Sequence, residues 1–296
     1  MHDSPALDLH FPTLAGPSDL GDRILLLLDD FQPLAVDEGT SASGAVHAPP
    51  TRWRVHFSTS ADRDRAATGV APALARLGVT ITPIDVPDEG WVERSQAGLR
   101  AIQIDRITVA PPWDVPEGSG ALLIVIRPSM GFGTGHHAST RLCLRALQRL
   151  DLAGRDVLDI GTGSGVLALA AARLGASRVV GIDCDPDALG NARENAALND
   201  LTGLLTLRQA DLADAERIGL EPADVVMANL TAGVLGQEAG RLRRLTRVGG
   251  MLIVSGVLVD QATPVAAALE SGGAMAVVWR EEEEGWVGLT LTSRQS

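Results

Sequence analysis

A chain of 296 residues, 45% of them hydrophobic, is long enough to bury one large core or two smaller ones. Its formal net charge of −12 argues against general electrostatic binding to nucleic acid, which requires lysine and arginine to neutralise phosphates. The first strongly apolar run, Ile24 to Leu28, is short and follows acidic residues, so we expect no signal peptide, no membrane span and a cytoplasmic location. Cys143 and Cys184 have no paired spacing, which predicts neither a disulfide framework nor a cysteine metal site.

Residues 1–90 predict a small domain of alternating strands and helices. Strands are expected where apolar and polar residues alternate, and helices where a capping Ser or Asp precedes a longer run. In chain order these segments are Leu7–Phe11, Pro17–Phe31, Phe31–Val36, Arg52–Thr59, Ser60–Gly78 and Val79–Val86. The order βαββαβ is typical of an α+β ferredoxin-like domain.

Residues 91–118 are expected to connect this domain to a second one, over residues 119–296. Prolines, glycines and acids in the connection surround one strand-like piece, Leu99–Trp113. The character of the sequence changes after it, which places the boundary there.

The second domain predicts an α/β fold of the Rossmann-like kind. Continuous apolar strands near Val157, Val225 and Leu252 alternate with helical patterns, which indicates a parallel sheet covered on both faces. The segment Ala274–Thr292 predicts two further strands that form an antiparallel hairpin at the sheet edge. We expect the acids between them, Glu281–Glu284, to form a solvated turn.

The stretch "VLDIGTGSGVLALAAARLGA" predicts a strand, a glycine turn and a helix, an arrangement that offers free N–H groups to a nucleotide. Gly161, Gly163 and Gly165 do not match the dinucleotide pattern G-x-G-x-x-G, because Val166 stands where the third glycine should fall. Asp159, just before the turn, would repel a pyrophosphate but can bind an ammonium group. The turn therefore favours S-adenosylmethionine, which carries an ammonium and no phosphate.

Asp183 ends the next predicted strand, "RVVGID". A carboxylate in this place can accept hydrogen bonds from both ribose hydroxyls of a nucleoside cofactor. The alternative is that it only caps the following helix, which begins near Asp185-Pro186.

Asn229 lies at the tip of the fourth predicted strand, "VVMANL". Its amide carbonyl, with neighbouring backbone carbonyls, can accept from a substrate amine and aim the nitrogen lone pair at a methyl group, which suits N-methylation. The alternative is that Asn229 caps the helix that begins near Thr231.

The loop "GFGTGHHAST", residues 131–140, leads into a helix and is expected to fold over the cofactor as a lid. Its adjacent histidines, His136 and His137, cannot easily share one metal ion, and no carboxylate cluster accompanies them. We therefore expect no metal site.

These motifs together resemble the ribosomal protein L11 methyltransferase (PrmA) family over about Trp113 to Trp286, through "MGFGTGHHAST", "VLDIGTGSGVLALAAARLGA", "VVGIDCDP", "NARENAALN" and "ADVVMANLTAGVL". The resemblance implies a class I methyltransferase that transfers methyl groups from S-adenosylmethionine to lysine ε-amines or the N-terminal α-amine of protein L11. It also implies that a flexible linker joins the N-terminal domain, which docks the substrate, to the catalytic domain.

The resemblance also implies roles for individual residues. It gives cofactor contacts to Thr140, Gly161, Asp183 and Asn229, to which the glycine turn itself adds Asp159 and Gly163, and it makes Phe132 and residues 133–136 a lid over substrate and cofactor. The expected catalytic residues are Asn229, Phe132 and His136. The N-terminal domain matches the family only in its predicted topology, and the loop Thr40–Pro50 departs from the expected pattern.

Three alternatives remain at this stage. The nearest is an N-methyltransferase of another protein or of a small molecule, which would share every cofactor residue. An NAD-dependent oxidoreductase is disfavoured by the glycine pattern and by Asp159. A non-catalytic RNA-binding or assembly factor would use aromatic residues on the first sheet, where Trp53 and Phe57 occur without a basic aromatic signature.

Overall fold

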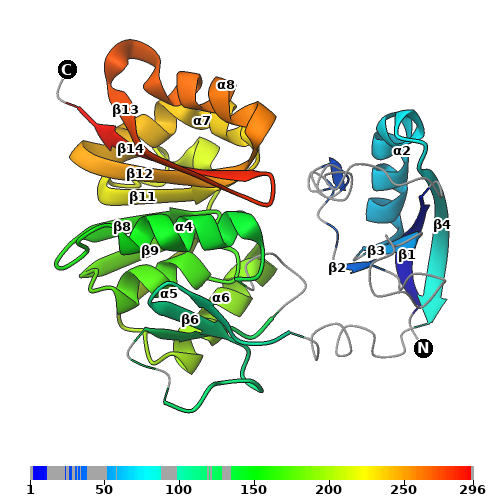
Figure 1. Ribbon diagram of the computed structural model, residues 1–296, viewed down its shortest axis with the longest axis horizontal. Coiled ribbons are helices and arrows are strands. Elements are labelled where there is room, and N and C mark those ends of the chain that lie inside the picture. The colour runs from blue at the N-terminus through cyan, green and yellow to red at the C-terminus, as the bar shows by residue number, and fades with distance from the viewer. Residues whose placement is uncertain are drawn as a thin grey trace. The chain divides into compact units, whose positions relative to one another are not determined.

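The computed structural model divides the chain into two compact units, Met1–Leu99 and Arg100–Ser296 (Figure 1). The residues that it describes are 3–11, 24, 27, 28, 31, 33, 35–38, 52–57, 59–87, 99–118, 120, 122–128 and 135–294. Phe132, the loop Thr40–Pro50 and most of the expected helix Pro17–Phe31 lie outside these residues. The division at Leu99 assigns the strand-like part of the expected connection to the second unit.

The first unit is built on a four-stranded antiparallel sheet of order β2-β3-β1-β4. Its elements are β1 (Asp3–His10), β2 (Ala35–Glu38), β3 (Arg52–His56), α2 (Ser60–Arg76) and β4 (Thr80–Pro87). This strand order agrees with the expected βαββαβ sequence of elements. Only Ile24, Leu27 and Leu28 are described as helical between β1 and β2, so the ferredoxin-like assignment stays a prediction.

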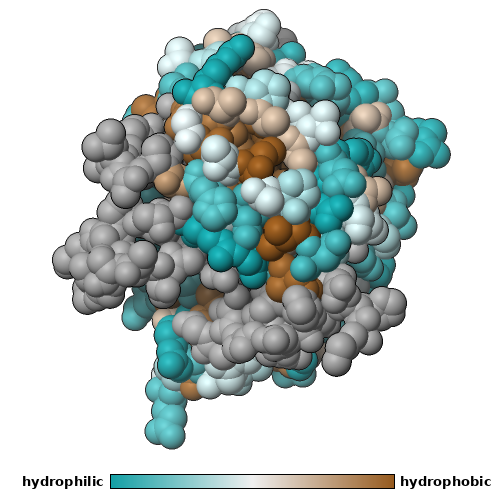
Figure 2. Space-filling model, turned by 90° about the vertical axis from the view of Figure 1, so that its right-hand side faces the viewer, coloured by the Kyte–Doolittle hydropathy of each residue, from teal (hydrophilic) through white to brown (hydrophobic). Residues whose placement is uncertain are grey.

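The core of the first unit lies between this sheet and α2. The helix begins after Thr59, whose side chain accepts from the Asp62 backbone N–H, and it buries Ala66, Val70 and Leu74 on one face. Trp53 and Phe57 are 5% and 1% exposed, so both aromatic rings lie in the core rather than on an open sheet surface. On the face that Figure 2 shows, the coloured hydrophobic residues form small groups among hydrophilic ones.

The second unit contains a seven-stranded sheet of order β10-β9-β8-β11-β12-β14-β13 and a three-stranded sheet of order β5-β6-β7. The strands are β5 (Ile102–Ile104), β6 (Ile107–Ala110), β7 (Leu123–Val125), β8 (Asp156–Ile160), β9 (Arg178–Asp183), β10 (Leu205–Gln209), β11 (Ala223–Asn229), β12 (Thr246–Leu258), β13 (Met275–Glu283) and β14 (Trp286–Ser293). The helices are α4 (Ala138–Gln148), α5 (Val166–Arg173), α6 (Pro186–Leu198), α7 (Ala232–Leu245) and α8 (Val259–Glu270), with short 3₁₀ turns at Leu212–Asp214 and Ser271–Gly273.

The large sheet confirms the expected α/β fold. Strands β10, β9, β8, β11 and β12 run parallel to one another, whereas β14, which pairs with β12, and β13 add the antiparallel hairpin at one edge. Within β11, Val225 and Met227 belong to the core beneath α4, α5 and α6, while Val226 and Ala228 face α7 and α8. Burial on both faces explains why these strands are continuous apolar runs. No helix in the described part of the chain is long and apolar enough to cross a membrane.

Helix α4 approaches β14 closely because Gly288 has no side chain. A Cβ atom at Gly288 would lie 2.9 Å from Cβ of Leu142 and 3.2 Å from the ring of Trp279. Real Cβ contacts are not this short, so a larger residue would push the helix away from the strand.

We expect Gly288→Ala to lower the free energy of unfolding by about 1–3 kcal/mol through overpacking. The matched control is Gly190→Ala in α6, where an added Cβ would have no neighbour within 4 Å. Since alanine is the better helix former, that variant should be neutral or more stable by up to about 1 kcal/mol. Urea unfolding followed by circular dichroism measures both, and equal stability of the two variants would contradict the packing argument.

Candidate active site

The candidate site lies at the carboxyl ends of β8, β9 and β11. Ile160 pairs with Ile182 on one side and with Ala228 on the other, so the residues that follow these three strands meet at one edge of the sheet. In open parallel sheets, this edge is where nucleotide ligands bind. The glycine turn, Asp183 and Asn229 therefore share one location, as the sequence predicts.

The turn after β8 requires glycine at three positions. Gly161, Gly163 and Gly165 have φ angles of 68°, 52° and 82°, a region that side chains with a Cβ rarely adopt. A Cβ at Gly161 would also lie 2.6 Å from the Leu230 side chain. The turn is closed by the N–H groups of Gly161 and Thr162, which both donate to the Ile182 carbonyl at 2.9 Å.

Asp159 lies beneath this turn and is 1% exposed. Its Oδ2 accepts from the Thr162 hydroxyl at 2.7 Å and from the Ala168 N–H at 3.1 Å, whereas its Oδ1 is buried without a partner among the described residues. Burial raises the pKa of the Asp159 carboxyl to about 7; the two hydrogen bonds oppose this rise and the Asp183 charge adds to it. An unsatisfied buried oxygen of this kind fits the ammonium expected from the sequence.

Thr162 was not singled out from the sequence. The signal in the sequence that could have identified it is a hydroxyl residue inside the turn, three residues after Asp159. Its contact orients the Asp159 carboxyl and leaves the second oxygen for a ligand.

Asp183 is held by two backbone N–H groups. Its Oδ2 accepts from Gly163 at 2.9 Å and its Oδ1 from Asp185 at 3.0 Å. The cap of α6 is Asp185, which accepts from the Asp187 N–H at 2.8 Å, so Asp183 is not the helix cap. Each Asp183 oxygen keeps a lone pair, which fits two ribose hydroxyls.

Asn229 meets Thr140 at the end of β11. Its Nδ2 donates to the Thr140 hydroxyl at 3.4 Å, although the two residues are far apart in the sequence. The Asn229 Oδ1 is buried and has no partner in the part of the chain that is described. Helix α7 begins after Thr231 without a side-chain cap, so Asn229 is not its cap. The arrangement leaves one amide carbonyl ready to accept a hydrogen bond from a ligand.

The two histidines of the expected lid have different surroundings. His137 caps α4, because its Nδ1 accepts from the Ser139 N–H at 3.3 Å. Its ring packs edge-on against Trp286, with the two ring centroids 4.5 Å apart. Burial lowers the pKa of His137, and Arg141 lowers it further, which keeps the accepting nitrogen neutral. His136 places Nε2 2.8 Å from the Arg100 carbonyl, and no described hydrogen bond joins it to Asn229. Its catalytic role, like that of Phe132, stays a prediction.

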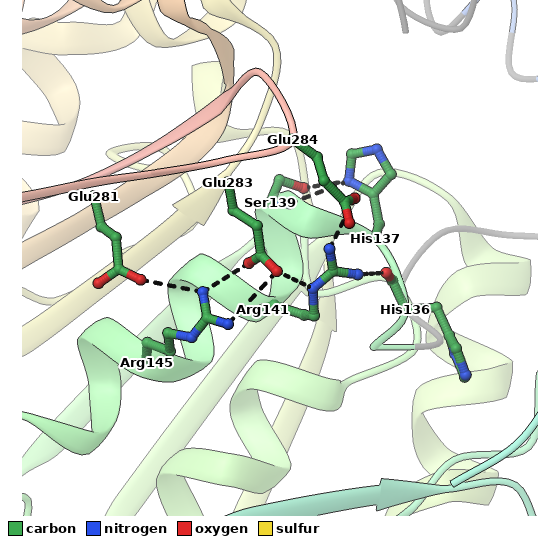
Figure 3. Close-up of polar contacts among 8 residues, drawn as sticks. All are labelled: His136, His137, Ser139, Arg141, Arg145, Glu281, Glu283 and Glu284. Carbon is green, nitrogen blue, oxygen red and sulfur yellow. Dashed lines mark hydrogen bonds and ion pairs between the residues drawn. The ribbon is translucent and has the colours of Figure 1, made fainter. Parts of the chain in front are cut away.

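Helix α4, which carries Thr140, is tied to the β13–β14 hairpin by ion pairs (Figure 3). Arg141 contacts Glu283 and Glu284, each at 2.8 Å, and also donates to the His136 carbonyl. Arg145 contacts Glu283 at 2.7 Å and Glu281 at 3.1 Å. The expected solvated turn at Glu281–Glu284 was therefore wrong: Glu281–Glu283 belong to β13, and three of the four acids pair with α4.

No group of three or more potential metal ligands occurs among the residues described. The site chemistry visible in the chain is instead made of one buried carboxyl, one half-buried carboxylate and one amide. These groups suit recognition of an ammonium, a ribose and an amine.

We expect Glu283→Gln to lower the free energy of unfolding by about 1 kcal/mol, because it removes the acid that both arginines share while the pairs stay partly solvated. The control is Glu282→Gln, since Glu282 pairs with Arg280 at an exposed position and with no arginine of α4 among the described residues. Thermal unfolding at low and high salt measures both. A loss that is no larger for Glu283→Gln than for Glu282→Gln would show that these ion pairs do not hold α4.

Comparison with known proteins agrees with this geometry. The sequence profile of the family "Ribosomal protein L11 methyltransferase (PrmA)" matches residues 56–294. Similar proteins of that name come from Deinococcus radiodurans, 42% identical over 70% of this chain and 80% of that one, and Cupriavidus pinatubonensis, 42% identical over 75% and 74%. A solved ribosomal protein L11 methylase from Lactobacillus delbrueckii subsp. bulgaricus is 27% identical with a TM-score of 0.59, over 67% of this chain and 99% of that one. The sequence resemblance is confirmed, and the chain belongs to the ribosomal protein L11 methyltransferase family.

Proposed function

We propose that this protein transfers methyl groups from S-adenosylmethionine to amines of ribosomal protein L11, at lysine ε-amines, the N-terminal α-amine or both. The observation that carries the proposal is the Asn229 carbonyl, which has no partner among the described residues and lies at the same sheet edge as the glycine turn and Asp183. Membership of the family supports both the reaction and the substrate.

The residues present fit the methyl donor. Asp159 Oδ1 would accept from its ammonium, Asp183 from its ribose hydroxyls, and the glycine turn would let the backbone approach it. When bound, S-adenosylmethionine supplies a methyl group on a sulfonium: an amine lone pair would form the new N–C bond as the S–C bond breaks, with S-adenosylhomocysteine as the leaving product. The chain then has to bind and orient the methyl donor and the amine and to exclude water, and it needs no metal ion for this step.

Asn229 is assigned to the substrate amine. An ammonium has no lone pair to attack with, so a lysine must lose a proton first, against a usual pKa of about 10.4. The Asn229 carbonyl accepts from an N–H of the neutral amine and thereby fixes the direction of its lone pair. Thr140 holds the other end of the amide and so sets the direction of that carbonyl.

The first unit is proposed to dock the substrate, since the cofactor residues all belong to the second unit. Methylation of another protein or of a small molecule remains the nearest alternative. The RNA-binding alternative depended on Trp53 and Phe57. Both side chains are buried, which disfavours that alternative. A ribosomal substrate supports the expected cytoplasmic location, and neither nucleic acid nor membrane is needed as a partner.

We expect Asn229→Ala to reduce single-turnover methyl transfer to L11 about a hundredfold, the cost of losing a few kcal/mol of orientation. Binding of S-adenosylmethionine should change much less, because Asp159, Asp183 and the turn remain. Asn229→Asp keeps an accepting oxygen and should retain part of the activity. Radiolabelled methyl transfer followed by mass spectrometry of L11 measures the rates and the sites.

This chain contains no lysine, so every methylated lysine found in that assay comes from the substrate. Transfer at the wild-type rate by Asn229→Ala would remove Asn229 from the reaction. Absence of labelled L11 with the wild type, while another protein is labelled, would favour the alternative substrate.

Asp159 predicts a pH dependence of cofactor binding. With a pKa of about 7, the carboxyl is neutral in acid and ionises as the pH rises through 7. S-adenosylmethionine should therefore bind up to about tenfold more tightly at pH 7.5 than at pH 6, until its own ammonium deprotonates near pH 8. In Asp159→Asn the affinity should be independent of pH from 6 to 7.5. Isothermal titration calorimetry tests this, and an unchanged slope in the variant would exclude Asp159.

The same pKa has a consequence for stability. The folded protein keeps the Asp159 proton up to about pH 7, whereas the unfolded chain releases it near 3.8. This one group therefore makes unfolding easier as the pH rises between these values, by an amount on the order of a few kcal/mol. Asp159→Asn should flatten this part of the stability profile in urea unfolding at different pH values.

A further inference from the structure

Helix α6 and the residue that caps its C-terminus carry three asparagines that the proposed reaction does not use. Asn191, Asn195 and Asn199 are spaced by four residues and so lie on one face of the helix. Asn195 is 0% exposed and Asn199 is 2% exposed. A buried amide is costly unless its donors and its acceptor are all satisfied, so the partners of this row indicate what it does.

The row binds the outer edge of β7 and of the two residues that follow it, 126 and 127, together called the β7 edge here. Asn199 accepts from the Val125 N–H at 2.9 Å and donates to the Val125 carbonyl at 2.7 Å. Asn195 accepts from the Arg127 N–H at 2.8 Å, and Asn191 donates to the Arg127 carbonyl at 3.1 Å. On its other side β7 pairs with β6. The side-chain amides thus take the place of a neighbouring strand.

Asn195 makes a contact with the glycine turn that Asn199 does not make among the described residues. Its Nδ2 donates to the Ser164 carbonyl at 2.8 Å and to Asn191 Oδ1 at 3.2 Å, so all of its polar capacity apart from one lone pair is used. Ser164 belongs to the glycine turn. A single buried amide therefore joins the turn to the β7 edge.

The glycine turn also packs closely against α6, so a change at Asn195 would affect the position of the turn. Gly165 ends the turn, and a Cβ there would lie 3.3 Å from Cβ of Ala192 in α6. Asn199, by contrast, uses its second donor hydrogen on the Asn195 backbone carbonyl at 2.7 Å and makes no described hydrogen bond to the turn.

We propose that Asn195 is a positioning residue for the cofactor site: its amide holds the Ser164 carbonyl, and through it the glycine turn, in the conformation that accepts S-adenosylmethionine. Asn195 is buried and does not itself touch the cofactor. This inference rests on the proposed function for the identity of the ligand, while the restraint on the turn stands on the hydrogen bonds alone.

The test compares Asn195→Ala with Asn199→Ala, which removes an equally buried amide from the same helix and the same β7 edge. Both variants should lose thermal stability. Only Asn195→Ala should weaken binding of S-adenosylmethionine, by about tenfold, the effect of one net hydrogen bond on the turn. Asn199→Ala should stay within about twofold of the wild type in calorimetry. In L11 methylation, Asn195→Ala should raise KM for the cofactor with little change in kcat.

Hydrogen exchange of the cofactor-free protein provides a readout that does not depend on the ligand. Peptides that cover residues 161–168 should exchange faster in Asn195→Ala than in Asn199→Ala. If neither of these variants folds, Asn195→Ser and Asn199→Ser replace them as a matched pair.

Two outcomes would overturn the inference: equal cofactor affinity and equal exchange of the turn in the two variants, or equal weakening of the affinity in both. Wild-type protein that binds no S-adenosylmethionine would instead remove the proposed function. The rate of hydrogen exchange in the glycine turn of the two variants would then still decide whether Asn195 restrains the turn.

Discussion

The turn between β8 and α5 is the constraint on which the rest of the site depends. Three positive φ angles within five residues are accessible only because Gly161, Gly163 and Gly165 lack side chains. The same glycines allow the Leu230 side chain and helix α6 to come within contact of the turn. The backbone bend and the close packing therefore have one cause, and the surrounding elements are arranged around it.

The chemistry of the site depends on groups that the fold leaves incompletely satisfied. Asp159 and Asn229 each keep a buried oxygen without a described partner, which costs free energy until a ligand supplies a donor. Both are oriented by a neighbour, Thr162 for Asp159 and Thr140 for Asn229, so that the open oxygen has a definite direction. Preorganised acceptors of this kind suit a reaction in which binding and orientation do most of the catalysis.

Two sets of polar contacts hold the elements that carry these groups. Arginines of α4 bind the acids of the C-terminal hairpin, which fixes the helix that carries Thr140 (Figure 3). The asparagines of the α6 row bind the β7 edge, and one of them, Asn195, also binds the glycine turn, which fixes the other side of the site. The ion pairs are partly solvated, whereas the side chains of Asn195 and Asn199 are buried, so these two asparagines are the more stringent restraint.

The sequence by itself determined the parallel sheet, its antiparallel edge hairpin, the glycine turn and the family, because these features rest on local periodicity and on short motifs. It also placed Asp183 and Asn229 at strand ends, and parallel topology then brings such ends together. The partners were decided by the tertiary structure alone: Asn229 with Thr140, Arg141 with Glu283, and Asn195 with Ser164. The four consecutive acids were expected to form a solvated turn because the residues next to them in the sequence do not indicate that two arginines on a distant helix bind them. Local patterns specify elements, whereas contacts between distant side chains arise only when packing sets their directions and distances.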